Sequence, residues 1–150
     1  MRIGHVHLKV ADLDRSLAFY RDALGFQLQG RIGDQAAFLS ADGDYHHHIG
    51  LNTFESAGGP PPAPGTTGLY HVALVYPTRE DLARAANGVS EHISHGSDHG
   101  VSEAVYLSDP DGNGIELYWD RPVHEWPRTP EGGLALVNLP LDVDALLSAA

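Results

Sequence analysis

An internal repeat constrains this chain more than any other feature of its sequence. The segment HVHLKV at residues 5–10 resembles HVALVY at 71–76, and IGL at 49–51 resembles IEL at 115–117. Both pairs have the same offset, because 71 − 5 and 116 − 50 each equal 66. The sequence therefore predicts two copies of one structural unit, and 150 residues are enough for one domain built from two such halves.

The first copy is predicted to be a βαβββ unit. Alternating apolar residues predict a strand over 3–10, followed by a helix that Asp12 caps and Gly25 ends. Three further strands are then expected, at residues 27–32, 36–40 and 45–53.

The second copy repeats this order after a connector rich in proline and glycine, SAGGPPPAPGTTG at 56–68. A strand over 69–76 leads into a helix whose start, Thr78 with Asp81 three residues later, resembles a capping box. The remaining strands are expected at residues 91–94, 102–107 and 114–119.

These elements predict an α+β fold in a single domain over residues 1–150. The parts are module 1 (3–55), the connector (56–68), module 2 (69–120) and a C-terminal extension (121–150). Four prolines predict irregular structure as far as Pro140, and Asp142 is placed to cap a short helix after it.

The stretch VYLSDPDGNGIELYW at 105–119 is predicted to be a strand, a tight turn and a strand. Asp, Pro, Gly and Asn fill its centre, and each favours turns. Alternation with period two places Glu116 on the face opposite Ile115 and Leu117. A half-buried carboxylate needs a partner or a metal ion, because an isolated charge is costly to bury.

The repeat places four residues at corresponding positions: His5, Gly50, His71 and Glu116. Strand parity puts the three that carry side chains on the face opposite the helices, where they converge if the sheets enclose a cavity. Two imidazoles and one carboxylate form the ligand set of non-haem Fe(II) sites, and the set also suits Mn(II) or Zn(II). Gly50 would leave room there for substrate and water. The alternative is a pair of core histidines hydrogen-bonded to Glu116.

Composition excludes several classes of protein. No cysteine is present, so disulfides and thiolate ligands are excluded. Nine basic against twenty acidic residues give a net charge of −11, which argues against binding to nucleic acid. No signal peptide or membrane span is recognisable, so a cytoplasmic protein without a membrane partner is expected. Ten histidines favour metal ligation or proton transfer.

Three motifs resemble the vicinal oxygen chelate superfamily, which includes glyoxalases, extradiol dioxygenases, fosfomycin resistance enzymes and bleomycin-binding proteins. They are HxxLxVxDLxxSLxFY (5–20), GLYHVAL (68–74) and DPDGNGIELY (109–118). The resemblance covers residues 3–120. It implies two βαβββ modules that form a curled mixed sheet around a metal-centred cavity, and it carries the family's metal ligands onto His5, His71 and Glu116.

Within the superfamily the chain is most similar to the catechol 2,3-dioxygenase branch. The segment YHHHIGLNT (45–53) is similar to the strand that carries an acid–base histidine, which implies that role for His47. Strand parity would instead turn His46 and His48 inwards, so His48 is the alternative.

The same branch has two further residues near its substrate. Its tyrosine lies ten residues before the carboxylate ligand, which implies a substrate hydrogen bond for Tyr106. His99 is the nearest match to a histidine that contacts oxygen or substrate, at a spacing two residues shorter. His7 and His46 are expected to support the ligands or to contact the substrate.

The resemblance thus implies a non-haem Fe(II) extradiol ring-cleavage dioxygenase that acts on a catecholic substrate and dioxygen in aromatic catabolism, as a homodimer. Two alternatives remain open. One is a metal-dependent isomerase or lyase of glyoxalase type, although Gly50 stands where glyoxalases carry a fourth ligand. The other is a non-catalytic protein that binds an aromatic drug, although such proteins commonly lack the three metal ligands.

Overall fold

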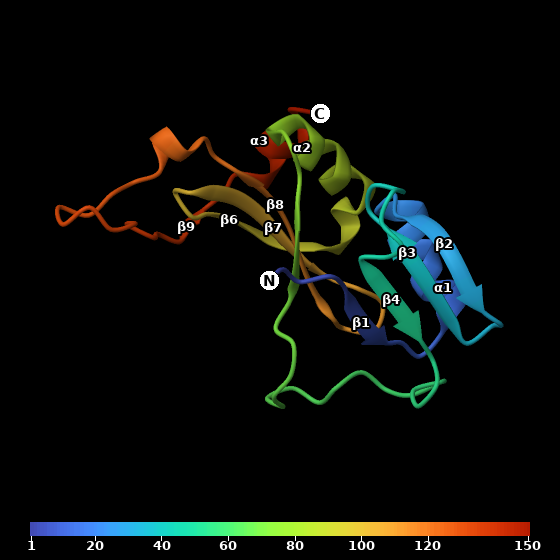
Figure 1. Ribbon diagram of the computed structural model, residues 1–150. Coiled ribbons are helices and arrows are strands. Elements are labelled where there is room, and N and C mark those ends of the chain that lie inside the picture. The colour runs from blue at the N-terminus through green and yellow to red at the C-terminus, as the bar shows by residue number, and fades with distance from the viewer. The chain divides into compact units, whose positions relative to one another are not determined.

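A computed structural model describes the chain over residues 1–150 (Figure 1). Its internal contacts divide it into two units. Unit 1 comprises Met1–Gly68 together with Asp109–Asn113, and unit 2 comprises Leu69–Ser108 together with Gly114–Ala150. Each unit contains one βαβββ module, so the two predicted copies are confirmed.

Unit 1 has the predicted order of strand, helix and three strands. Its elements are β1 (Val6–Lys9), α1 (Leu13–Leu17), the π-helix η1 (Ala18–Ala23), β2 (Gln27–Ile32), β3 (Ala36–Ser40) and β4 (Ile49–Asn52). The sheet order is β1-β4-β3-β2, with β1 and β4 parallel and the other neighbours antiparallel. Figure 1 shows α1 lying against one face of this sheet.

The helix of unit 1 begins and ends where the sequence predicts. The Asp12 carboxylate accepts a hydrogen bond from the backbone N–H of Arg15 at 2.9 Å, which satisfies a free donor of the first turn. Gly25 follows the C-cap residue Leu24 with φ of +83°, a conformation that glycine adopts without strain. The switch from α-helix to π-helix at Ala18 was not predicted.

Unit 2 repeats the module and adds a further strand and helix. Its elements are β5 (Val72–Val75), α2 (Arg79–Gly88), the 3₁₀ turn η2 (Ser90–His92), β6 (Ile93–Asp98), β7 (Ser102–Ser108), β8 (Gly114–Asp120), the 3₁₀ turn η3 (Val123–Glu125), β9 (Leu139–Pro140) and α3 (Val143–Leu147). The sheet order is β5-β8-β7-β6-β9, and only β5 and β8 are parallel. The Thr78 hydroxyl accepts from the Asp81 N–H, as the capping box predicts.

The strand register reproduces the offset of the sequence repeat. His7 lies opposite Gly50 across β1 and β4, and Ala73 lies opposite Glu116 across β5 and β8. Both partners of the second pair lie 66 residues after those of the first (73 − 7 and 116 − 50). Each pair combines a small residue with a large one. In unit 1 the large side chain, His7, is on the first strand of the module, whereas in unit 2 the large side chain, Glu116, is on β8.

Four predicted strands differ from the observed ones by more than one residue at an end. The strand expected at 91–94 is observed as β6 (Ile93–Asp98), directly after the 3₁₀ turn η2. The predicted strands over 3–10 and 69–76 are shortened to β1 and β5, so that His5 and His71 each stand one residue before the first strand of their module. The prediction of a strand over 45–53 is wrong for its first half, since β4 begins at Ile49. Residues 45–48 belong instead to a loop.

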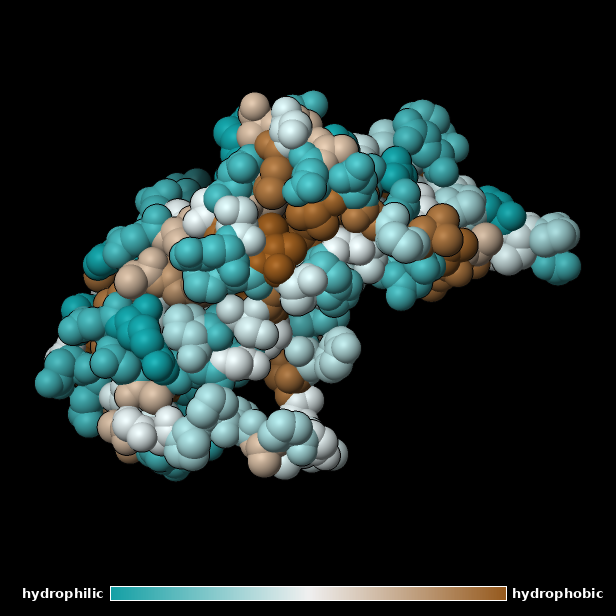
Figure 2. Space-filling model, turned by 180° about the vertical axis from the view of Figure 1, so that it is seen from behind, coloured by the Kyte–Doolittle hydropathy of each residue, from teal (hydrophilic) through white to brown (hydrophobic).

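The C-terminal extension packs on its own unit. Strand β9 pairs with the end of β6, within a region that was predicted to be wholly irregular. Helix α3 begins after Asp142 as predicted, its Leu146 is fully buried, and the Asn87 side chain of α2 donates to the Leu147 carbonyl at 2.9 Å. Figure 2 shows a hydrophobic patch on the projecting part of the extension, at the right of the view, among hydrophilic residues. Four of its apolar side chains are exposed: Leu134, Leu136, Val137 and Leu139.

No helix in this protein has both the length and the apolar character needed to cross a membrane.

Candidate active site

A hydrogen-bonded cluster in unit 2 surrounds Glu116. Ile115 and Leu117 are fully buried on one face of β8, and Glu116 is on the other face, where its side chain is 12% exposed. Its Oε1 accepts a hydrogen bond from the Tyr106 hydroxyl at 3.0 Å, and its Oε2 lies 3.0 Å from His71 Nε2. The carboxylate therefore has the partners that its position on the strand requires.

The β7–β8 hairpin accounts for the spacing of Tyr106 and Glu116. The turn at 109–113 places these two residues directly opposite each other across the antiparallel pair. Directly opposed side chains in such a pair are close neighbours, so a separation of ten residues in sequence becomes a contact. The ten-residue spacing that predicted a role for Tyr106 thus corresponds to direct pairing of Tyr106 with Glu116 across β7 and β8.

His71 approaches β8 closely because position 114 is a glycine. A Cβ atom at Gly114 would collide with the Tyr70 carbonyl oxygen and would lie 3.1 Å from His71 Cβ. The Nδ1 atom of His71 is buried and has no hydrogen-bond partner within this structure. The imidazole is held by the contact of its Nε2 with Glu116 and by ring contacts with Tyr70 and Tyr106, at centroid distances of 5.4 and 5.8 Å.

Tyr106 has two further neighbours in unit 2. His99 Nε2 lies 2.8 Å from its hydroxyl oxygen, and the His95 ring stacks on its ring with centroids 4.7 Å apart and an angle of 12°. Burial, followed by the hydrogen bond and charge of Glu116, raises the pKa of Tyr106, so its hydroxyl keeps its proton at neutral pH. The role of His95 was missed, because only a bulge in β6 brings it opposite Tyr106.

Unit 1 brings together several of the predicted histidines. The rings of His5 and His47 are 4.3 Å apart, and Phe38 lies edge-on to His47 at 5.1 Å and to His7 at 5.9 Å. A Cβ at Gly50 would lie 2.6 Å from His7 Nδ1, so glycine makes room for that ring. Burial lowers the pKa of both His7 and His47, and the neighbouring His5 lowers it further.

The loop before β4 separates the roles of His46, His47 and His48. The Asp42 carboxylate accepts from the N–H groups of Asp44 and Tyr45, and these bonds curl the chain where a strand was predicted. His48 Nδ1 accepts from the Ala41 N–H at 3.1 Å, so His48 holds the loop closed.

Neither His46 nor His47 is hydrogen-bonded to the loop backbone in this way. The Nδ1 atoms of His46 and His47 are 2.6 Å apart, and His47 in turn contacts His5. Of the two acid–base candidates, His48 is therefore hydrogen-bonded to the loop backbone, whereas His47 contacts the side chains of His46 and His5.

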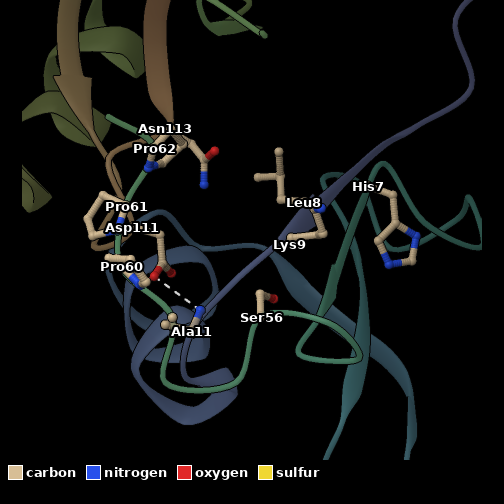
Figure 3. Close-up of a pocket in the computed structure, with 11 residues that line it drawn as sticks. His7, Leu8, Lys9, Ala11, Ser56, Pro60, Pro61, Pro62, Asp111 and Asn113 are labelled. Carbon is tan, nitrogen blue, oxygen red and sulfur yellow. Dashed lines mark hydrogen bonds between the residues drawn. The ribbon is translucent and has the colours of Figure 1, made fainter. Parts of the chain in front are cut away.

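A pocket in unit 1 lies beside β1 and the start of the connector (Figure 3). Its volume is about 250 Å³, and Lys9, Asn113 and the three prolines at 60–62 contribute to its wall. Asp111 is drawn there with its hydrogen bond from the Ala11 N–H, which is 3.1 Å long. Because the volume lies just below the roughly 300–1,000 Å³ of common ligand pockets, and because Asp111 is already paired, this hollow offers little for a substrate.

The predicted metal ligands are divided between the units, with His5 in unit 1 and His71 and Glu116 in unit 2. No three His, Asp or Glu side chains are arranged here as a ready metal site. His71 and Glu116 nevertheless fit a divalent cation. Two donor atoms about 2.1 Å from one ion and at a right angle lie about 3.0 Å apart, and Nε2 and Oε2 are 3.0 Å apart. Nitrogen and oxygen donors suit Fe(II), Mn(II) and Zn(II).

Comparison with known proteins places the chain in a family. The family model described as "Glyoxalase/Bleomycin resistance protein/Dioxygenase superfamily" matches residues 2–117. The chain belongs to this superfamily. Among solved structures, a glyoxalase/dioxygenase from Nostoc punctiforme shares the superfamily fold, with a TM-score of 0.65 and 24% sequence identity over 81% of this chain and 92% of that one.

The names of several relatives state a reaction, and two of these relatives are described here. "Catechol-2,3-dioxygenase" of Bacillus subtilis (strain 168) is 43% identical over 152 residues, which cover 99% of this chain and 52% of that protein. "Manganese-dependent 2,3-dihydroxybiphenyl 1,2-dioxygenase" of Geobacillus genomosp. 3 is 30% identical over 87% of this chain and 39% of that protein. The chain thus spans about half the length, or less, of these relatives.

Proposed function

We propose that this chain is an enzyme that catalyses extradiol ring cleavage of a catecholic substrate by dioxygen, with a divalent non-haem metal ion. The observation that carries the proposal is the Glu116 cluster, in which the carboxylate of Glu116 on β8 and the imidazole of His71 just before β5 lie 3.0 Å apart. It is supported by the 43% identity to a protein named catechol-2,3-dioxygenase.

His71, Glu116 and His5 are the proposed metal ligands. The first two are supported by their spacing, and His5 by its equivalence to His71 in the repeat. A bound Fe(II), or Mn(II) as in the name of one relative, would supply the redox-active centre that a spin-allowed reaction of an aromatic ring with dioxygen requires. Zn(II) suits the ligands but has no redox chemistry of its own.

The other residues of the site would position groups and move protons. Tyr106 keeps its hydroxyl proton at neutral pH and donates it in a hydrogen bond to Glu116 Oε1. His47 is the proposed acid–base residue, since His48 is engaged by the loop. General acid–base catalysis of this kind contributes about 10²–10⁴-fold to a rate.

The test is anaerobic reconstitution with Fe(II), followed by measurement of oxygen uptake and ring-fission absorbance with a panel of catechols. We expect uptake coupled to a ring-opened product, and loss of both in His71→Ala. His124→Ala is the matched control, because that side chain is 81% exposed on η3. Stoichiometric metal binding without oxygen uptake across the panel would favour an isomerase or lyase of glyoxalase type. No metal binding would favour a protein that binds an aromatic ligand.

Two further properties belong to the proposal. We propose a cytoplasmic homodimer, which mass measurement in solution would distinguish from a monomer of 16.1 kDa.

A further inference from the structure

The C-terminal extension holds His99 through the backbone of Val137. The Val137 carbonyl lies 3.2 Å from His99 Nδ1, and the Val137 N–H donates to the His99 carbonyl at 3.5 Å. Strand β9 continues this contact along the end of β6, where Leu139 pairs with Asp98. His99 is therefore held between the β6–β7 turn, to which it belongs, and the extension.

Two glycines on either side of His99 leave room for the extension. A Cβ at Gly96 would lie 2.8 Å from Val143 Cγ2. A Cβ at Gly100 would lie 2.8 Å from Pro127 Cγ and 3.2 Å from Val137 Cγ2. Since real Cβ atoms rarely approach other atoms so closely, larger residues at either position would push the extension away.

The contact with Val137 also shows that a particular nitrogen of the His99 imidazole, Nδ1, carries a hydrogen. A backbone carbonyl can only accept a hydrogen bond, so Nδ1 of His99 must carry a hydrogen. This orients the ring and directs Nε2 at the Tyr106 hydroxyl, 2.8 Å away. A hydroxyl has one hydrogen, and Tyr106 donates it to Glu116 Oε1, so Nε2 of His99 must also carry a hydrogen and donate it to the Tyr106 oxygen. This arrangement leaves Glu116 Oε2 facing His71.

We propose that the C-terminal extension positions the Glu116 carboxylate, through His99 and Tyr106. Val137, His99 and Tyr106 are then positioning residues for Glu116. The inference rests on the proposed function, because it takes Glu116 to be a metal ligand. Residues that orient a metal ligand by hydrogen bonds typically change metal affinity by about 10–100-fold when they are replaced.

The first test measures Mn(II) affinity by calorimetry on the full chain. Tyr106→Phe removes the hydroxyl alone and should weaken binding by about 10–100-fold. Gly100→Ala pushes the extension away from His99 and should weaken binding about 10-fold. Gly65→Ala is the matched control, because Gly65 has a similar φ of +81° and nothing within 4 Å of the added Cβ. Unchanged affinity in Tyr106→Phe would overturn the proposal.

A double-mutant cycle distinguishes an effect on Mn(II) affinity that acts through Tyr106 from a general disturbance of the fold. If the extension acts through Tyr106, adding Gly100→Ala to Tyr106→Phe should cause no further loss of Mn(II) affinity. If the two losses multiply, the extension acts by another route and the proposal is wrong. An unfolding measurement on each variant shows whether the fold is kept.

A metal-free measurement separates this inference from the proposed function. In the wild-type protein, ¹⁵N NMR should show His99 with a fixed hydrogen on Nδ1, and Gly100→Ala should release it and shift the Glu116 ¹³Cδ signal. A Glu116 signal that stays in place would overturn the inference. Metal binding without oxygen uptake, or no metal binding at all, would end the proposed function but leave this measurement to decide the positioning.

Discussion

The Tyr20 hydroxyl donates a hydrogen bond to Asp109 Oδ2 at 2.8 Å, across 89 residues of sequence. Both residues are buried, with Tyr20 fully inaccessible and Asp109 4% exposed. The same carboxylate accepts from the N–H groups of Asp111 and Asn113. The bond therefore joins η1 to the turn at 109–113, both within unit 1, and lets that turn bury a charge.

Tyr20→Phe should destabilise the protein. The variant keeps the ring but removes one donor from a buried carboxylate, which costs about 1–3 kcal/mol. Urea unfolding monitored by circular dichroism would measure the loss. Tyr70→Phe, at a side chain that is 89% exposed, should change stability little. Equal stability of Tyr20→Phe and the wild type would mean that Asp109 is satisfied without this bond.

Gly50→Ala should also destabilise, for a steric reason. The added Cβ would lie 2.6 Å from His7 Nδ1, so the ring must move at a cost of about 1–3 kcal/mol. Gly30→Ala in β2 is the control, because nothing lies within 4 Å of its added Cβ. Unfolding midpoints would compare the two, and similar values would argue against the close packing of His7 on Gly50.

His47→Ala and His48→Ala should differ in kind. With metal loaded in both, His47→Ala is expected to lower kcat by about 10²–10⁴-fold and to leave stability nearly unchanged. His48→Ala should instead loosen the loop, because the Ala41 N–H loses its acceptor. Turnover and thermal unfolding of each variant would separate them. Full turnover in His47→Ala would refute its acid–base role.

The stability of the loop before β4 should depend on pH through the Asp42 carboxyl group. The N–H of Tyr45 and the Ser40 hydroxyl donate to its carboxylate and lower the pKa of Asp42 from 3.8 to about 2. Because the folded pKa lies below the unfolded one, the stabilisation is complete above about pH 4 and is lost as pH falls through about 2. The ¹³C signal of the Asp42 carboxyl should titrate near pH 2, and a midpoint near 4 would contradict these bonds.

Leu146→Ala should destabilise unit 2, since the side chain is fully buried in α3. Removal of a buried leucine side chain typically costs about 2–5 kcal/mol. Leu136→Ala in the same extension is 70% exposed and should have little effect. Calorimetric unfolding would test both. A small effect of Leu146→Ala would mean that the extension is not part of the cooperative fold.

Local sequence patterns determined much of the fold. The period-two alternation of β8, the caps at Asp12 and Thr78, and the turn at 109–113 each depend on residues a few positions apart, and all are found in the structure. The repeat offset of 66 residues predicted which positions correspond, and the strand register agrees with it. Tyr106 could be selected from sequence because a hairpin turns a fixed spacing into a contact.

The sequence alone could not assign the histidines at 46–48. Strand parity predicted that His46 and His48 share a face, but side-chain bonds from Asp42 end the strand pattern and form a loop. Side-chain bonds to the backbone compete with regular structure in a way that periodicity does not register.

Tertiary structure also decided the surroundings of His99. Its contact with Val137 joins residues 38 positions apart, and no local pattern predicts it. The short-range preferences of this chain therefore determined its two modules and their register. The partners of Glu116, Tyr106 and His99 depended on which distant backbone groups packing brought within hydrogen-bonding distance, because a buried polar group is satisfied by whatever donor or acceptor the fold places beside it.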